Sequence, residues 1–206
     1  GLGIATQFAA SGADVILNSF TNRDEDHALA DSISEAHGVK ARYIQAELAD
    51  GQAARHLIET AGACDILVNN AGLQHVAPIT EFPVEKWDSI IAIMMSSAFH
   101  TTAAALPMLR AAGWGRVINM SSAHGLTASP FKAAYVTAKH GLVGMTKVVA
   151  LETAEEDITA NAICPGYVLT PLVEAQIPAT MEEYGMDRET AVREVMLARQ
   201  PSRAFS

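Results

Sequence analysis

The chain has 206 residues and a formal net charge of −9; half of its residues are hydrophobic and 18% are charged. This composition excludes a disordered chain, and the acidic balance argues against nucleic acid as a partner. No stretch reaches the roughly 18 apolar residues of a membrane span, so we expect no membrane partner and a cytoplasmic protein.

Apolar runs alternate with helical patterns along the chain. Runs typical of buried strands lie at 13–18, 40–45, 64–70, 115–122 and 158–164. Helical patterns lie at 2–11, 23–38, 50–62, 83–112 and 130–156. Strands that alternate with helices indicate βαβ units. The sequence therefore predicts an α/β fold with a doubly wound parallel sheet, in one domain over 1–206.

The segment 171–200 differs from the rest because it is amphipathic and helical and contains no strand pattern. Pro178 and Gly185 are expected to break it. An insertion of this kind after a strand end is typical of a mobile lid. We expect this segment to cover the substrate.

Ligands of open parallel sheets bind beyond the carboxyl ends of the strands. Small or amide side chains occupy these ends at 69–72, 121–122 and 165–166. Cys64 and Cys164 lie in or beside apolar runs, which favours two buried thiols in a reducing compartment. No spacing of His, Cys, Asp and Glu suggests a metal site, and His75, His100 and His140 are expected in the core or on the surface.

Lys132, Tyr135 and Lys139 fall on one face of the helix expected from residue 130. A solvated polar face would give the same pattern. A catalytic reading is also open, because a free phenol ionises near pKa ~10 and a cation one turn away stabilises the phenolate. Ser122, at a strand end, could hold a substrate oxygen against such a phenol.

The combination of motifs resembles the short-chain dehydrogenase/reductase family over the whole chain. The matching residues are NNAG at 69–72, Ser122, YVTAK at 135–139 and PGYVLT at 165–170, with Ser122 thirteen residues before Tyr135. The resemblance implies a Rossmann-like fold and hydride transfer with a nicotinamide coenzyme. It also implies Tyr135 as general acid/base, Lys139 as the cation that assists it and binds ribose, and Ser122 as the oxygen anchor.

The resemblance further implies which residues bind the coenzyme. They are Gly1, Gly3, Phe20, Glu47, Leu48, Asn70, Ala71, Gly72, Tyr135, Lys139, Pro165, Gly166, Val168 and Thr170. No arginine directly follows the strand at 13–18 to meet a 2′-phosphate, which favours NAD. Arg23 lies close enough to keep NADP open.

Lys132 indicates the substrate, since it lies one turn, roughly 5 Å, before Tyr135 on the expected helix. The carboxylate of a small 3-oxo acid could reach this cation while its carbonyl meets Tyr135. Segments such as ILVNNAGLQHVAPI and SSAHGL are most similar to family members that interconvert (R)-3-hydroxybutyrate and acetoacetate. That similarity implies Gln74, Ser122, His124, Lys132, Tyr135 and Gln176 as substrate contacts.

The sequence departs from the family at several places. Met94 stands where the family has a helix asparagine that supports a kink and a proton relay, so we expect impaired relay. Tyr167 replaces a tryptophan. Gly1 and Gly3 match only the end of the glycine-rich loop TGxxxGxG. We therefore expect the fold to lack its first strand and its last strands and to bind dinucleotide weakly.

Two other functions stay open at this point. One is reduction of 3-oxoacyl groups on a carrier with NADPH, and the other is dinucleotide binding without efficient turnover. The family pairs its long helices between subunits, here around 83–112 and 130–156, so a homotetramer is expected.

Overall fold

The computed structural model describes residues 1–198, 200 and 202–205. The chain divides into two compact units, Gly1–Ile163 and Cys164–Ser206. The expected lid at 171–200 falls in the second unit, and its residue 199 lies outside the described residues, as do 201 and 206 of the expected domain.

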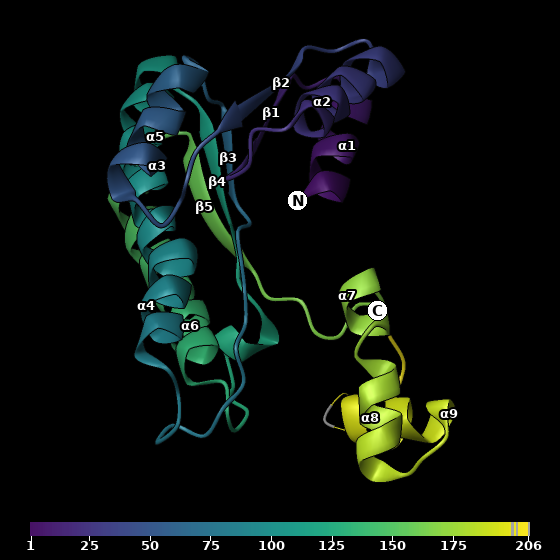
Figure 1. Cartoon of the computed structure of the whole chain (residues 1–206). Helices are drawn as coiled ribbons and strands as arrows, with labels where there is room; N and C mark the ends of the chain where they lie inside the picture. The colour runs from purple at the N-terminus through teal and green to yellow at the C-terminus, as the bar shows by residue number, and fades with distance from the viewer. Residues whose placement is uncertain (199, 201, 206) are drawn as a thin grey trace. The chain divides into compact units, whose positions relative to one another are not determined.

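Five strands form the first unit's sheets. They are β1 (Val15–Ser19), β2 (Ala41–Gln45), β3 (Ile66–Asn69), β4 (Gly115–Met120) and β5 (Ile158–Ile163). Strands β1 and β2 pair in parallel, and a second parallel sheet has the order β3-β4-β5 (Figure 1). All five predicted strands are confirmed, with ends that differ from the predicted ones by at most two residues.

Helices accompany the strands as the alternation predicts. They are α1 (Leu2–Ala10), α2 (Asp24–His37), α3 (Gly51–Ala61), α4 (Val84–Ile91), α5 (Ser97–Ala112) and α6 (Ala133–Glu152), with a π-helical stretch, η1 (Ala92–Ser96), between α4 and α5. In Figure 1, α1 and α2 lie on the side of the strands opposite to α3 and α5. This placement of helices on two sides is that of a doubly wound α/β fold.

The main core lies between the three-stranded sheet and the helices α3, α5 and α6. Leu67 of β3, Val117 of β4 and Ala160 of β5 present apolar side chains to Leu109 of α5 and Val149 of α6. Every second residue of β4 is buried. The apolar runs of the sequence therefore fill this interface, which fixes where each strand ends.

Helix α6 begins three residues later than predicted. Phe131 has a left-handed backbone (φ 65°), and Lys132 is the N-cap with φ −116°, so neither has the helical conformation. The Ala77 N–H donates to the Phe131 carbonyl at 3.0 Å, which ties this corner to the loop after β3. Lys132 therefore occupies the N-cap position of α6 and is not part of its first turn.

The second unit is helical, as predicted, with α7 (Pro171–Glu174), α8 (Ile177–Tyr184), α9 (Arg188–Thr190) and a π-helical stretch, η3 (Ala191–Met196). Gly185 ends α8 in the left-handed conformation (φ 62°), as expected. The break predicted at Pro178 is confirmed, because α7 ends at Glu174 and α8 begins at Ile177, just before this proline. Pro178 lies in the first turn of α8, where a missing backbone N–H costs no hydrogen bond.

The expectation that no segment could span a membrane is also wrong by length and composition. The helical stretch Val84–Ala112 has 29 residues and is apolar enough to cross a bilayer on those two measures. Ile90, Ala98 and Leu109 of this stretch are buried in the first unit. Packing in the core accounts for its apolar character, because a helix covering a sheet needs the same residues.

Candidate active site

Tyr135 and Lys139 lie one turn apart on α6, next to Ala134 and Ala138, which are fully buried. Lys139 is only 4% exposed, so the polar stripe is not a solvated face. Its Nζ lies 5.6 Å from the centroid of the Tyr135 ring and donates a hydrogen bond to the Met120 carbonyl at 2.5 Å. A buried ammonium therefore stands beside the phenol, held by the end of β4.

Ser122 follows β4 and is the N-cap of a short turn, η2 (Ala123–Gly125). Its Oγ accepts a hydrogen bond from the His124 N–H at 3.1 Å. Because this bond uses a lone pair, the hydroxyl proton stays available to donate to a substrate oxygen. The contact between η2 and α6 brings Ser122 to the helix that carries Tyr135.

His124 lies beside the same phenol. Its ring centroid is 6.0 Å from that of Tyr135 in an edge-on arrangement, and its Nε2 is 2.8 Å from Ser129 Oγ. A histidine held from one side by a hydroxyl keeps a fixed ring orientation. The turn η2 therefore brings Ser122 and His124 close to the helix that carries Tyr135 and Lys139.

Lys132 is half-buried, and burial lowers the pKa of its ammonium below the usual lysine value. Its ammonium makes no hydrogen bond or ion pair to any other described residue. Removing a cation from water without giving it a partner costs free energy. The arrangement suits an anion that supplies the missing partner.

The NNAG segment lies beside the start of α1. Asn70 and Gly72 are exposed, and a Cβ on Gly1 would lie 3.2 Å from Asn70 Nδ2. Gly1 is also the N-cap of α1, and no side chain caps that helix end. Free backbone N–H groups at a helix start bind phosphate, so these residues fit the pyrophosphate of a dinucleotide.

The residues expected near the adenosine lie in the loops that follow β1 and β2. Phe20 is largely exposed at the end of β1, and Leu48 is half-buried. Glu47 accepts a hydrogen bond from the Ala49 N–H at 3.0 Å. Arg23 pairs with Asp26 at 3.0 Å, and this pairing holds the pKa of Asp26 far below its usual range.

The remaining predicted residues lie apart from this group in the sequence. Gln74 is exposed in the loop after β3, and Gly3 is exposed in α1. The second unit carries Pro165, Gly166, Val168, Thr170 and Gln176. Within that unit, Gln200 accepts from the Tyr167 N–H at 3.3 Å, and Thr170 accepts from the Val173 N–H at 3.3 Å. Gln176 occupies the N-cap position of α8 without a capping hydrogen bond from its side chain.

A buried polar ladder behind the site was not predicted. Asn69 donates to Asn119 at 2.8 Å across the β3–β4 register, and Thr101 of α5 donates to Asn69 at 2.7 Å. Asn119 in turn donates to Thr146 of α6 at 2.8 Å. The ladder joins two helices through the strand ends that precede Asn70 and Ser122. An asparagine inside each of two apolar strand runs was the signal that could have revealed it.

Met94 lies in η1 and is only 2% exposed. It packs in a cluster with Ile90, Ala134, Ala138 and Tyr135. A Cβ on Gly72 would lie 3.8 Å from its Cε. The helix is distorted here although the family asparagine is absent, so Met94 forms an apolar wall between the NNAG segment and the phenol.

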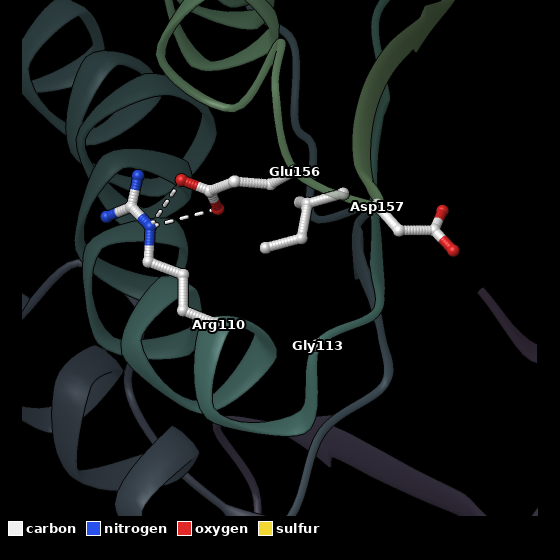
Figure 2. A pocket seen from close by; sticks show the side chains of 5 residues that line it. Arg110, Gly113, Glu156 and Asp157 are labelled. Atoms are coloured by element: carbon white, nitrogen blue, oxygen red, sulfur yellow. Dashed lines mark hydrogen bonds and ion pairs between the residues drawn. The ribbon is translucent and has the colours of Figure 1, made fainter.

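A hollow of about 430 Å³ lies at the opposite ends of the strands and is lined by Arg110, Gly113, Glu156, Asp157 and Ile158. Figure 2 shows the ion pair between Arg110 Nε and Glu156 Oε1, 3.0 Å apart, that crosses it. None of the predicted site residues lines it. Among the described residues no cluster of three or more His, Cys, Asp and Glu could hold a metal.

Comparison with known proteins agrees with this geometry. The family model for short chain dehydrogenase matches residues 1–180. D-beta-hydroxybutyrate dehydrogenase of Cupriavidus necator is 51% identical, covering the whole chain and 80% of that protein, and the enzyme of the same name from Rhizobium meliloti is 49% identical, covering the whole chain and 81%.

A crystal structure assigned to a short-chain alcohol dehydrogenase of Sinorhizobium meliloti 1021 superposes with a TM-score of 0.84. It is 29% identical, and the match covers the whole chain and 78% of that protein. The predicted resemblance and the Rossmann-like fold class are confirmed by these matches. The chain therefore belongs to the short-chain dehydrogenase family of oxidoreductases.

Proposed function

We propose that the protein transfers a hydride between NAD and a small 3-hydroxy acid, with (R)-3-hydroxybutyrate and acetoacetate as the substrate pair. The names of the relatives that are 51% and 49% identical support this assignment. The observation that carries it within the chain is Lys132, a half-buried ammonium without a described partner, three residues before Tyr135.

A free 3-oxo acid supplies what Lys132 lacks. One methylene group separates its carboxylate from its carbonyl carbon. The carboxylate can therefore contact Lys132 while the carbonyl oxygen contacts Tyr135. A charge-assisted hydrogen bond to a desolvated ammonium is stronger than one between neutral groups. A thioester has no such carboxylate and would leave the ammonium unpaired.

The chain's own residues handle the proton. NAD, held by the coenzyme contacts named from the family motifs, would supply the acceptor for the hydride on the carbon that bears the hydroxyl. Tyr135, as phenolate, takes the hydroxyl proton, and Ser122 donates a hydrogen bond to the same oxygen. Lys139, whose ammonium faces the Tyr135 ring at 5.6 Å, stabilises the negative charge on the phenol. In the reverse direction Tyr135 returns the proton to acetoacetate.

The coenzyme proposed is NAD rather than NADP. A 2′-phosphate needs a cation near the end of β1, and Arg23 is the cation nearest in sequence. Arg23 already contacts Asp26 at 3.0 Å and Glu25 at 3.6 Å. Binding NADP through Arg23 would require these contacts to be given up, whereas NAD makes no such demand.

The other predicted contacts complete the proposal. Gln74, His124 and Gln176 are proposed to bind the substrate, and the segment 171–200 to act as its lid. The coenzyme is proposed to contact the fourteen residues named from the family motifs, including Pro165, Gly166, Val168 and Thr170 of the second unit. We place the reaction in the cytoplasm, which the two free cysteines favour.

A substrate panel tests the assignment. The purified chain is assayed with (R)-3-hydroxybutyrate, its (S) enantiomer and a 3-hydroxyacyl thioester, each with NAD and with NADP. We expect kcat/KM to be highest for the (R) acid with NAD. Lys132→Ala should lower kcat/KM for the free acid about 100-fold, since a desolvated charged hydrogen bond contributes roughly 2–3 kcal/mol.

The same panel distinguishes the other two functions. Higher activity on the thioester with NADPH, unchanged by Lys132→Ala, would support a 3-oxoacyl-carrier reductase instead. NADH binding without turnover of any 3-oxo acid would support a dinucleotide-binding protein. Lys86→Ala, a change at an exposed lysine on α4, serves as the control for loss of a surface charge.

A homotetramer is proposed on the exposed apolar residues of the long helices. Phe99 on α5 and Val148 and Leu151 on α6 are exposed, although their helices are otherwise apolar. Large apolar side chains gathered on helix faces are typical of subunit contacts. These faces would pair with the same faces of other copies.

A further inference from the structure

The end of β4 is tied to the middle of α6 through Ser121. The Ser121 hydroxyl donates to the main-chain carbonyl of Lys139 at 2.9 Å, and Ser121 is only 6% exposed. The Ser121 N–H donates to the Ile163 carbonyl at the end of β5, 2.8 Å away. One residue therefore fixes two strand ends and the turn of α6 from which Lys139 projects.

Gly125 of η2 packs closely against Ser121 and the Lys139 carbonyl. A Cβ on Gly125 would lie 2.3 Å from Ser121 Oγ, 2.9 Å from the Lys139 carbonyl oxygen and 3.0 Å from Val143 Cγ2. Real Cβ atoms do not approach backbone oxygens this closely, so only glycine fits without a shift. The turn η2, which follows Ser122 and holds His124, thus rests directly on α6.

This contact has a geometric consequence for the reaction. Ser122 belongs to the strand end and Tyr135 to the helix, thirteen residues away in sequence. Their two oxygens must meet the same substrate oxygen, yet no bond between their side chains sets their separation in the described structure. The distance between the two oxygens instead depends on the contact between Ser121, Gly125 and the Lys139 carbonyl, which joins the strand end to the helix.

We propose that Ser121 and Gly125 are positioning residues that set the distance between the Ser122 hydroxyl and the Tyr135 phenol. They touch neither substrate nor coenzyme, and they act through Ser122, Tyr135 and Lys139. The proposal rests on the proposed hydride transfer for its kinetic consequence. A misplacement of about 1 Å in such a site can lower turnover about 100-fold.

A purely structural role makes a different prediction. Loss of a buried hydroxyl lowers the stability of the fold, but it leaves the turnover of the folded molecules unchanged. Thr153 provides the matched control. It is fully buried, and its hydroxyl donates to the Val149 and Ile158 carbonyls at 2.9 and 3.2 Å, at the far end of α6. Thr153→Val removes a comparable hydroxyl while it keeps the side-chain shape.

The kinetic experiment compares Ser121→Ala, Gly125→Ala, the double variant and Thr153→Val. With kcat referred to the fraction that binds NADH, we expect about a tenfold loss for Ser121→Ala and about a 100-fold loss for Gly125→Ala. KM for NAD should rise by a smaller factor than kcat falls, because only Tyr135 and Lys139 among the proposed coenzyme contacts depend on Ser121 and Gly125. The double variant should lose less than the product of the two single losses, because removing Ser121 Oγ makes room for the new methyl group. Thr153→Val should keep the parent kcat.

A second readout is independent of turnover. The ring ¹³C resonances of Tyr135, assigned with Tyr135→Phe in protein labelled at tyrosine, should move in Ser121→Ala and Gly125→Ala but not in Thr153→Val. Parent-like Tyr135 resonances in both site variants would overturn the proposal, whatever the substrate is. Moved resonances in a chain that turns over no 3-hydroxy acid would refute the proposed function alone. Equal kcat losses in Ser121→Ala and Thr153→Val would reduce Ser121 to a structural role.

Discussion

At the scale of single residues, the site separates two lysines by their surroundings. Lys139 is buried and has an oxygen partner, the Met120 carbonyl, whereas the Lys132 ammonium is half-buried and has none among the described residues. The first arrangement holds the Lys139 amino group beside the phenol. The second is a charge that becomes favourable only when an anion arrives. These different surroundings fit the two roles proposed for the lysines, one chemical and one in recognition of the substrate.

Burial of Lys132 predicts an alkaline limit to substrate binding. Its pKa lies below the usual 10.5, so the ammonium loses its proton, and KM for 3-hydroxybutyrate should rise, at a pH lower than for an ordinary lysine. Steady-state kinetics between about pH 7 and 10.5 measure this limb. Lys132→Arg keeps its charge throughout this range and should abolish the limb. An identical limb in Lys132→Arg would assign it to another group.

The lowered pKa of Lys132 also makes the stability of the fold depend on pH. Because the folded chain holds this proton less tightly than the unfolded chain, the unfolded state binds more protons between the two pKa values. Lys132 therefore costs stability below its folded pKa, and this cost falls as the pH rises toward 10.5.

The motif residues could be predicted from the sequence, but the contacts behind them could not. Tyr135, Lys139 and Ser122 have a spacing that is specific to one chemistry, and the helix period places two of them together. Ser121 and Gly125 act through a helix carbonyl eighteen residues along the chain from Ser121. No periodicity records which carbonyl a hydroxyl meets, since that depends on how the strand and helix pack.

At the scale of elements, the π-helical stretch η1 bears most directly on the chemistry. Such stretches are frequent at functional sites because they reorient side chains within a helix. Here the distortion turns Met94 toward the cluster that includes Tyr135. The distortion is present with methionine at this position, so an asparagine is not required for it.

Met94→Asn tests whether the apolar wall limits proton movement. An amide at this position could hold a water near Lys139, so we expect kcat to rise up to about tenfold, within the range that proton-transfer catalysts supply. The cost should be about 1–3 kcal/mol of stability, since a polar group enters a buried site. Kinetics in H₂O and D₂O and thermal unfolding measure the two effects.

Met94→Leu is the control, because it changes the shape but adds no hydrogen-bonding group. Its kcat should stay near the parent value. If Met94→Asn left both kcat and its solvent isotope effect unchanged, the idea of an impaired relay would be wrong.

Element boundaries were predicted where composition decides them and missed where backbone geometry does. The αL-conformation of Gly185 follows from its residue type. The late start of α6 depends on a left-handed phenylalanine, 55% exposed, whose carbonyl is held by the Ala77 N–H. Local propensity disfavours that conformation for an aromatic residue, so tertiary contacts had to be known first.

At the scale of the whole molecule, the parallel direction of the strands could be predicted from the alternation of strands and helices, but their order in the sheets could not. The apolar length of Val84–Ala112 was underestimated, because Ser and Thr within it interrupt the apolar run without lowering its mean hydropathy below that of a span. Those residues, among them Thr101 and Thr102, bond to the helix itself and to Asn69.

The proposed tetramer predicts that a charge on α6 disrupts assembly. Leu151, 78% exposed, should tolerate lysine in the monomer, so Leu151→Lys should lower the sedimentation coefficient without unfolding the chain. Leu126→Lys, at an exposed leucine beyond η2, controls for added surface charge and should sediment like the parent. A parent chain that sediments as a monomer would contradict the tetramer.

The ion-paired hollow of Figure 2 lies where β4 and β5 begin, whereas Ser122 follows the end of β4. Six residues of extended strand separate the two ends by about 20 Å. The residues proposed for catalysis and the ion-paired hollow therefore lie at opposite ends of the strands. Asp157 is exposed on the edge of the hollow, so a dye or an immobilising linker joined there would not contact the reacting groups. This end of the strands is therefore a suitable attachment site for an electrode-bound or optical ketone sensor made from the protein.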